Sequence, residues 1–145
     1  MTEATKINLV SVATAGALAG AVHFGLTGIV NGGILRLELQ DWLRGASSLV
    51  HPPAQSVSMS LWATMSLIYG VSGVWIYAGI RPRFGAGPKT AVLAGLSLWI
   101  VSKFTVALDL AALGLVPGRI IVGQSVGGLV AVVLGVFLGA WLYKE

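Results

Sequence analysis

The last long apolar stretch, Gly118–Tyr143, has the sequence GRIIVGQSVGGLVAVVLGVFLGAWLY and decides the fold class. Arg119 is its single charged residue. A helix needs about 20 mainly apolar residues to cross the roughly 30 Å hydrocarbon layer of a bilayer. Three earlier stretches, Ile7–Leu35, Ser56–Ile80 and Thr90–Leu115, are also long enough and similarly apolar. We therefore expect four transmembrane helices.

The composition agrees with a chain that lies almost wholly in the membrane. Hydrophobic residues make up 56% of the 145 residues and charged residues only 10%, whereas soluble domains carry about 25% charged residues. The apolar stretches do not alternate with polar residues, as the strands of a membrane β-barrel do. The spans and their loops leave no room for a soluble domain. Residues 1–145 are thus expected to form a single all-α domain, an antiparallel four-helix bundle in the membrane.

The basic residues near the span ends predict the orientation of this bundle. The N-terminus, the loop 81–89 and the C-terminus carry five of them: Lys6, Arg81, Arg83, Lys89 and Lys144. The other two loops carry three: Arg36, Arg44 and Arg119. Because basic loops stay on the cytoplasmic side, both termini and loop 81–89 are expected in the cytoplasm. The net charge of +4 is interpreted as this orientation signal and not as nucleic-acid binding, since no basic stripe could follow phosphates.

Aromatic and basic residues at the cytoplasmic ends of the second and fourth spans predict anchoring to lipid head groups. Trp and Tyr prefer the headgroup level, and each nearby basic residue gains about 1 kcal/mol from anionic lipid. The expected anchors are Trp75, Tyr77, Trp141, Tyr143, Arg81, Arg83 and Lys89. The alternative for the basic loop is a docking point for a cytosolic partner or an anionic ligand.

The loop Arg36–Gln55 is the one sizeable segment expected outside the membrane. Leu39, Trp42 and Leu43 could share one face of a short helix that lies on the membrane surface. An ordinary loop with a buried Trp42 is the alternative. Pro52-Pro53 would stop a helix there, and Ser56 could cap the start of the second span.

Small residues recur at a spacing of four in two of the spans. The fourth span carries Gly123, Gly127, Ala131, Gly135 and Gly139, and the first span carries Ala13, Ala17, Ala21 and Gly25. Such rows let helix backbones approach closely, and close packing drives helix association in lipid. Both rows are predicted to be packing surfaces, either within one chain or between copies.

Polar residues in the spans are the candidates for a functional site. His23, Thr27, Asp109 and Gln124 all fall in the outer half of their spans and could meet as one hydrogen-bonded cluster. The functional interpretation is a proton- or ion-coupled site in which Asp109 titrates beside His23, and the structural one is a set of interhelical hydrogen bonds. Lys103 lies about 120° around its helix from Asp109. It is expected to be an isolated charge whose stem snorkels or whose head meets Tyr69.

Several kinds of chemistry are disfavoured by what the chain lacks. It has no cysteine, so disulfides and thiolate sites are excluded. Haem would need axial ligands from facing spans, but His23 and His51 are the only histidines, and His51 lies in a loop. A zinc site would need three or four ligands at suitable spacing, and no nucleophile or phosphate-binding motif occurs. We therefore expect no metal, no cofactor and no enzymatic activity.

The loop Ile80–Ala91, with the sequence IRPRFGAGPKTA, is more specific than a generic basic loop. Together with Trp99, the segment Ala111–Leu115 and the ending Gly139–Glu145, it resembles a family of small four-span proteins of the bacterial inner membrane. The resemblance covers about the last two-thirds of the chain. It implies a multi-pass protein of that membrane but no established activity and no catalytic residues.

Three functions remain open at this point. The first is a non-enzymatic accessory or scaffold protein that packs through its small-residue rows, as a homo-oligomer or in a larger membrane complex. The second is an oligomeric small transporter or channel that uses the outer polar cluster. The third, less favoured, is a membrane enzyme or a quinone-binding protein.

Overall fold

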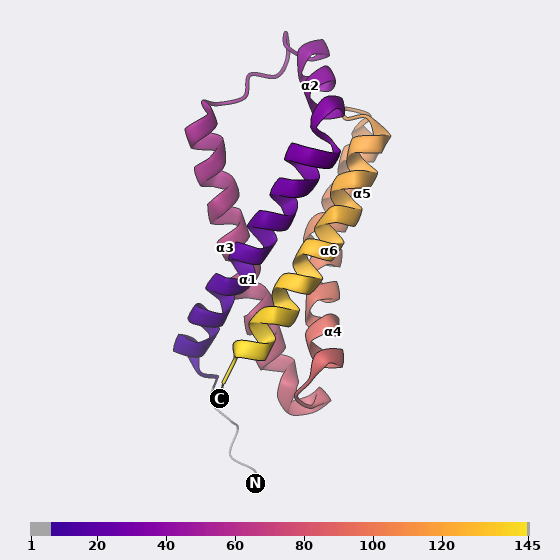
Figure 1. Ribbon diagram of the computed structural model, residues 1–145. Helices are drawn as coiled ribbons and strands as arrows, with labels where there is room; N and C mark the ends of the chain where they lie inside the picture. The colour runs from indigo at the N-terminus through magenta and orange to yellow at the C-terminus, as the bar shows by residue number, and fades with distance from the viewer. Residues whose placement is uncertain (1–6, 145) are drawn as a thin grey trace.

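A computed structural model describes residues 7–144, and within this range it contains helices and no strands (Figure 1). Four helical segments are long and apolar enough to cross a membrane: Leu9–Ile34, Gln55–Phe84, Pro88–Leu113 and Gly118–Leu142. They pack against one another in an antiparallel bundle, which confirms the predicted all-α four-helix fold. Lys6 and Glu145, used above for the orientation and the resemblance, lie outside the described residues.

The first and third spans each change helix type along their length. The first consists of α1 (Leu9–Ile29) and the π-helical segment η1 (Val30–Ile34). The third consists of α4 (Pro88–Trp99), the π-helical segment η2 (Ile100–Phe104) and α5 (Thr105–Leu113). The second and fourth spans are the single helices α3 (Gln55–Phe84) and α6 (Gly118–Leu142). Short π-helical segments of this kind are rare and occur frequently at functional sites.

Both described ends of the chain and the turn after α3 lie at one end of the bundle, which we call the terminal end (Figure 1). Lys144 N–H donates a hydrogen bond to Ser11 Oγ at 2.8 Å, which ties the two ends of the chain together. At the opposite end, the α2 end, the short helix α2 (Arg36–Gly45) follows the first span. A stretch from Ser47 to Ala54, exposed except at the half-buried Val50, then leads to α3.

Two predicted boundaries need correction. The loop expected at 81–89 is only a short turn, because α3 continues through Pro82 to Phe84 and Pro88 already begins α4. Gly85 and Gly87 make this turn with φ angles of 83° and 145°, a range that favours glycine. At the start of α3, Ala54 occupies the N-cap position and Ser56 lies inside the first turn, so Ser56 does not cap the helix.

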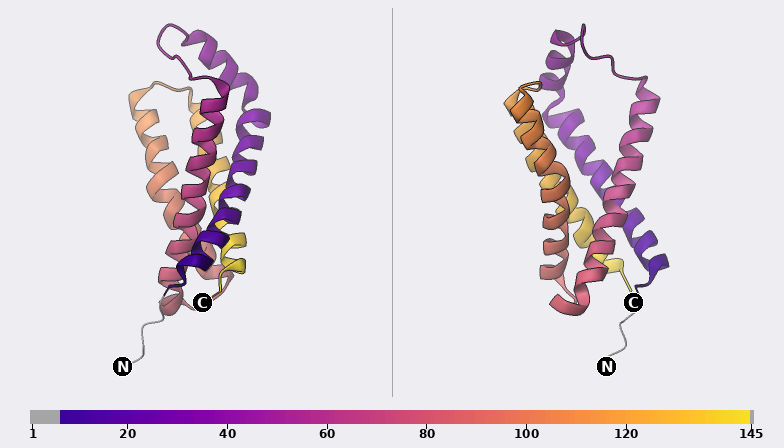
Figure 2. Two further views of the ribbon diagram at one scale, coloured as in Figure 1. Left: turned by 90° about the vertical axis from the view of Figure 1, so that its left-hand side faces the viewer. Right: turned by 180° about the vertical axis from the view of Figure 1, so that it is seen from behind.

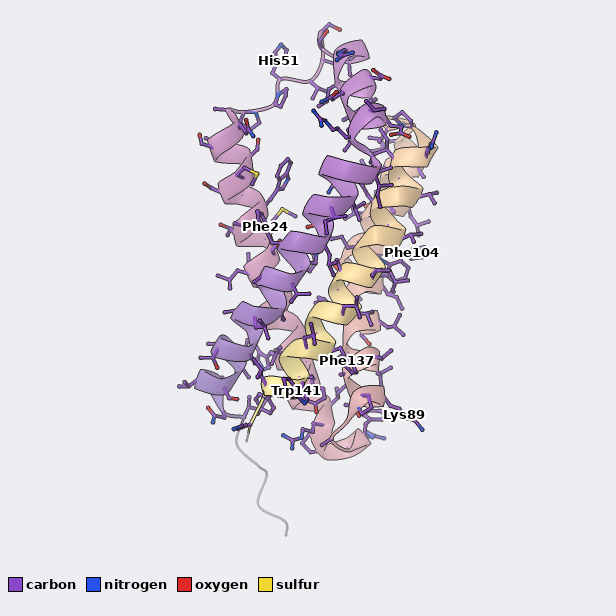
Figure 3. The ribbon with its side chains drawn as sticks, viewed as in Figure 1. Phe24, His51, Lys89, Phe104, Phe137 and Trp141 are labelled. Carbon is purple, nitrogen blue, oxygen red and sulfur yellow. The ribbon has the colours of Figure 1, made fainter. Side chains whose placement is uncertain are left out.

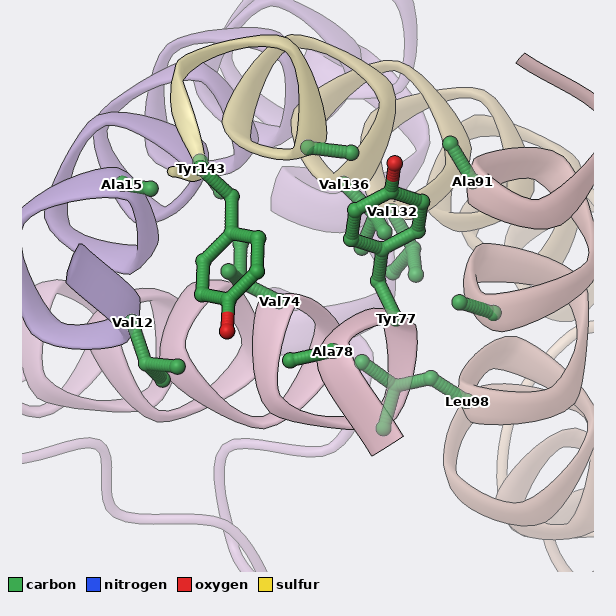
Figure 4. Close-up of a cluster of buried hydrophobic side chains, with 13 residues drawn as sticks. Val12, Ala15, Val74, Tyr77, Ala78, Ala91, Leu98, Val132, Val136 and Tyr143 are labelled. Carbon is green, nitrogen blue, oxygen red and sulfur yellow. The ribbon is translucent and has the colours of Figure 1, made fainter. Parts of the chain in front are cut away.

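The core of the bundle lies toward the terminal end (Figure 4). Val74 of α3 and Val136 of α6 are fully buried there, beside Tyr77, Tyr143 and a set of alanines. The helices come this close because small residues line their contacts. A Cβ atom on Gly70 of α3 would collide with the backbone of Gly16 and Gly20 on α1. The α1–α3 contact is therefore backbone against backbone.

Toward the α2 end the helices separate (Figure 2). From Gln55 to Met65 every residue of α3 is exposed except Ser58, which is half-buried. The helix α5 contains no buried residue. The bundle thus has a packed half at the terminal end and an open half at the α2 end, where α3 lies apart from the other three spans.

The two small-residue rows have different fates in this fold. Gly127, Gly135 and Gly139 of α6 lie against the first span, Gly123 lies against Leu35 directly after it, and Ala131 is completely buried. This row therefore lies on the face of α6 that meets the first span. The row Ala13, Ala17, Ala21 and Gly25 is exposed on α1, and nothing among the described residues lies within 4 Å of a Cβ placed on Gly25. The faces of α1 that pack are Gly16–Gly20 and Ala15–Ala19 instead, because glycines at spacing four permit a closer approach than the alanine row does. Packing of the exposed row between copies stays a prediction.

Candidate functional site

The most polar contact between spans lies where α1 crosses α3. His23 of α1 is 3% exposed, and its Nδ1 atom lies 2.9 Å from Ser66 Oγ of α3. One helical turn further along α3, the ring of Tyr69 stacks on the imidazole with a centroid distance of 4.8 Å and an interplanar angle of 32°. Gly20 allows this arrangement, because a Cβ atom at this position would collide with the backbone of Ser66 and Leu67.

Lys103 approaches the same tyrosine from η2 of the third span. Its Nζ atom lies 4.7 Å from the centroid of the Tyr69 ring, which is the contact that the sequence predicted as one option. The aliphatic stem of Lys103 lies beside Gly128 of α6, where a larger residue would narrow the space. A cation over an aromatic face is stabilised by about 0.5–2 kcal/mol. We call His23, Ser66, Tyr69 and Lys103 the central polar cluster.

No carboxylate balances this cluster among the described residues. Glu38 pairs with Arg119 at 3.1 Å, and Asp41 pairs with Arg44 at 3.5 Å, both near the α2 end. Asp109 is exposed on α5 and makes no hydrogen bond or ion pair within residues 7–144. The central polar cluster is therefore a cationic site with hydrogen-bond donors and no acidic partner from the described chain.

The predicted outer cluster of His23, Thr27, Asp109 and Gln124 does not form. Thr27 Oγ1 donates to the carbonyl of His23 in its own helix at 2.8 Å. Gln124 Nε2 donates to Asn31 Oδ1 at 3.1 Å, which links α6 to η1. Asp109 meets none of them, because α5 lies in the open half, whereas His23 is buried where α1 crosses α3. All four residues lie in the half of their spans that is nearer the α2 end, but their helices turn them toward different neighbours.

Ser66, the partner of His23, was not among the residues predicted for the site. Two signals could have identified it. Gly16 and Gly20 form the small-xxx-small pair that brings α1 onto α3, and Ser66 lies one turn before Gly70 at the matching point of α3. His23 follows Gly20 by one turn, so it faces the same neighbour.

The expected headgroup anchors divide into two groups. Trp75 and Trp141 are exposed, and so are Arg83 and Lys89; Lys89 points away from the bundle (Figure 3).

The other group, Tyr77 and Tyr143, is buried in the core. The two rings lie edge to face at 6.1 Å and cannot anchor to lipid. Their hydroxyls accept backbone N–H groups of Gly87 and Asn8, each at 3.4 Å. Arg81 lies over the Tyr143 ring at 5.7 Å, so its head is directed into the bundle.

The short helix α2 forms where the sequence allowed it. Trp42 is half-buried, and its Nε1–H donates to the carbonyl of Leu115 at 3.2 Å. The Glu38–Arg119 ion pair makes a second link from α2 to the start of α6. These two contacts hold α2 over the ends of α5 and α6 at the α2 end (Figure 1).

The chain matches no family model, no curated protein and no solved structure in the comparisons made. Within residues 7–144, no group of three or more His, Asp or Glu side chains could hold a metal ion. The chemistry available at the central polar cluster is that of hydrogen-bond donation and positive charge. The Ser66 hydroxyl and the His23 imidazole lie within hydrogen-bond distance of each other, but no carboxylate among residues 7–144 orients the imidazole as in a catalytic triad.

Proposed function

We propose that this chain is a non-enzymatic accessory or scaffold protein of the bacterial inner membrane, with both termini in the cytoplasm. Its packed half would form a stable anchor, and its open half would receive the helices of a membrane partner or of another copy. The excess of basic residues at the terminal end and the resemblance to small four-span inner-membrane proteins support the location and the orientation.

The observation that carries this proposal is the unpartnered carboxylate of Asp109 on a helix with no buried residue. Ionisable groups within a span are costly in contact with lipid and usually face a protein interior or a polar partner. The described part of the chain supplies neither. A polar group from a neighbouring membrane protein would remove this cost and would cover α5 at the same time.

The alternative, a transporter or channel built on the outer polar cluster, gains no support from the geometry. It required Asp109 and His23 to act together, and the two side chains lie in different parts of the bundle. Thr27 and Gln124 are each engaged in other hydrogen bonds.

Cysteine cross-linking in native membranes tests the proposal. The chain contains no cysteine, so a single introduced cysteine gives an unambiguous attachment point. Val57→Cys and Leu108→Cys place it in the open half, and Leu138→Cys places it on the exposed surface of the packed half. We expect a discrete protein adduct from the first two positions, with Asp109→Leu reducing its yield. Equal yields from all three positions, or no protein adduct from the open half, would contradict the proposal.

A further inference from the structure

We propose that Lys103 and Tyr69 form an intramembrane binding site for the carboxylate head group of a lipophilic acid. The site lies at the point where α3 and the third span last touch before they separate. Lys103 supplies the charge, and Tyr69 holds its ammonium group in place from the facing helix. The His23 imidazole lies against the Tyr69 ring, and the hydrogen bond between Ser66 and His23 holds the imidazole in this position.

Lys103 is too deep in its span to reach either membrane surface. The span runs from Pro88 to Leu113, and at 1.5 Å per residue Lys103 lies roughly 22 Å and 15 Å from these ends along the axis. A lysine stem snorkels only near the ends of a span. The stem also packs on Gly128 and the head on Tyr69, which directs the charge into the bundle. The charge is therefore held near the middle of the membrane.

Two nitrogen atoms of the cluster, Lys103 Nζ and His23 Nε2, make no hydrogen bond among the described residues. Lys103 makes no hydrogen bond or ion pair within residues 7–144, although its ammonium group carries three N–H donors. His23 Nε2 is buried and makes no hydrogen bond within the same range. When Ser66 donates to Nδ1, Nε2 carries a proton and becomes a further donor. Buried donors that lack acceptors are costly, so an acceptor bound at this place would be stabilising.

The depth and the surroundings favour a lipophilic carboxylic acid over other anions. The neighbours of Lys103 along η2, Ile100, Val101 and Phe104, are exposed and apolar, which suits an acyl chain. An ion dissolved in water would have to cross hydrocarbon to reach the site, at a high cost in free energy. A carboxylic acid can cross in its neutral form and bind as the ion that Lys103 requires. The polar head group of a phospholipid stays at the membrane surface, outside the reach of Lys103.

Binding can be measured by quenching of tryptophan fluorescence with dibromostearic acid, on the full-length chain in a neutral detergent at near-neutral pH. Trp99 is the reporter, because its ring lies 5.1 Å from that of Phe104, the residue next to Lys103. We expect a saturable component of the quenching that Trp99→Phe removes, whereas the quenching of the other four tryptophans remains. The methyl ester of the same acid has the same tail but no charge, and it is expected to bind at least tenfold more weakly.

Substitution of the lysine tests the role of its charge. Lys103→Met is expected to weaken binding of the acid by about tenfold or more, and Lys103→Arg to keep it within about threefold, since a charge pair in this setting is worth a factor of that order. Lys89→Met, which removes an exposed charge, is the control and should change nothing. Equal affinity for acid and ester, or unchanged affinity in Lys103→Met, would overturn the proposal. The ester comparison uses the unaltered chain, so it decides the question even if a variant fails to fold.

Discussion

The two halves of this bundle are built from the same four spans but differ in how those spans meet. In the packed half, glycine and alanine bring α1, α3 and α6 into backbone contact around Val74 and Val136. In the open half, the outer part of α3 lies apart from the other spans, and α5 contacts α6 but has no buried residue. The helix α3 belongs to both halves, so it allows a comparison within one helix (Figure 2).

This difference shows what holds membrane helices together. Lipid tails are as apolar as leucine, so burying an apolar side chain between spans gains little of the hydrophobic free energy that it would gain in water. Close packing and interhelical hydrogen bonds remain as the attractive contributions. A span that lacks small residues at the right places can therefore stay unpacked in lipid at little cost. The outer part of α3, from Gln55 to Met65, is an example.

The largest expected effect comes from filling the α1–α3 crossing. Gly70→Leu would drive a side chain into the backbone of Gly16 and Gly20, and neither backbone can move aside without separating the helices. We expect a loss of more than about 3 kcal/mol in the free energy of unfolding, or failure to fold. Unfolding in mixed micelles, followed by circular dichroism, measures this effect.

The matched substitution for this crossing is Gly25→Leu on α1. Nothing lies within 4 Å of a Cβ at Gly25, so the stability of the isolated chain should stay within about 0.5 kcal/mol of its original value. Gly25 belongs to the exposed small-residue row. If Gly25→Leu instead breaks up an oligomer in membranes, the row packs between copies, and the comparison of the two halves must be made on the oligomer.

A smaller effect is expected from removing methyl groups in the two parts of α3. Val74 is 0% exposed and Val57 is 48% exposed. Val74→Ala leaves a cavity between helices and should reduce the free energy of unfolding by about 1–2 kcal/mol through lost van der Waals contacts. Val57→Ala should change it by less than about 0.5 kcal/mol. Equal losses in the free energy of unfolding at both positions would mean that the outer part of α3 packs against the other spans in the membrane.

The sequence was sufficient to predict the spans and insufficient to predict which faces meet. Long apolar segments fix the number of crossings, because a bilayer has a nearly constant thickness. Contact faces depend on helix rotation, and the row Ala13–Gly25 and the pair Gly16–Gly20 both fit a packing pattern. Only the position of Gly70 on the facing helix decides between them. Tyr77 and Tyr143 illustrate the same limit, since an aromatic belt and an aromatic core have the same composition.

Several residues of the candidate site were predicted from the sequence, but the way in which they come together was not. His23, Lys103 and the contact of Lys103 with Tyr69 were identified from residue type and depth. Asp109 was assigned to His23 because both lie in the outer half of their spans. The separation of the outer part of α3 from the rest of the bundle is a tertiary property, and no local pattern in the chain records it.

A still smaller effect is expected from the hydrogen bond between His23 and Ser66, which lies at the border of the two halves. Ser66→Ala removes the partner of Nδ1, and hydrogen bonds between membrane helices contribute about 0.6 kcal/mol on average. Ser60→Ala is the control, because Ser60 Oγ only donates to the carbonyl of Ser56 in its own helix. A double-mutant cycle with His23→Ala measures the coupling. A coupling of zero would show that stacking on Tyr69 alone positions the imidazole.

The smallest effect is expected at the far end of the open half, where α2 is attached. Glu38→Gln removes the charge that pairs with Arg119, whose side chain is largely exposed, and such pairs contribute about 0–1 kcal/mol. We expect amide hydrogen exchange in α2 to accelerate by a few-fold, and the acceleration to vanish at high salt, which already screens the pair. Asp41→Asn removes only a pair within α2 and is the control. If α2 exchanges rapidly even in the unaltered chain, then Trp42 and Arg119 do not hold it, and the open half extends to include the whole α2 end.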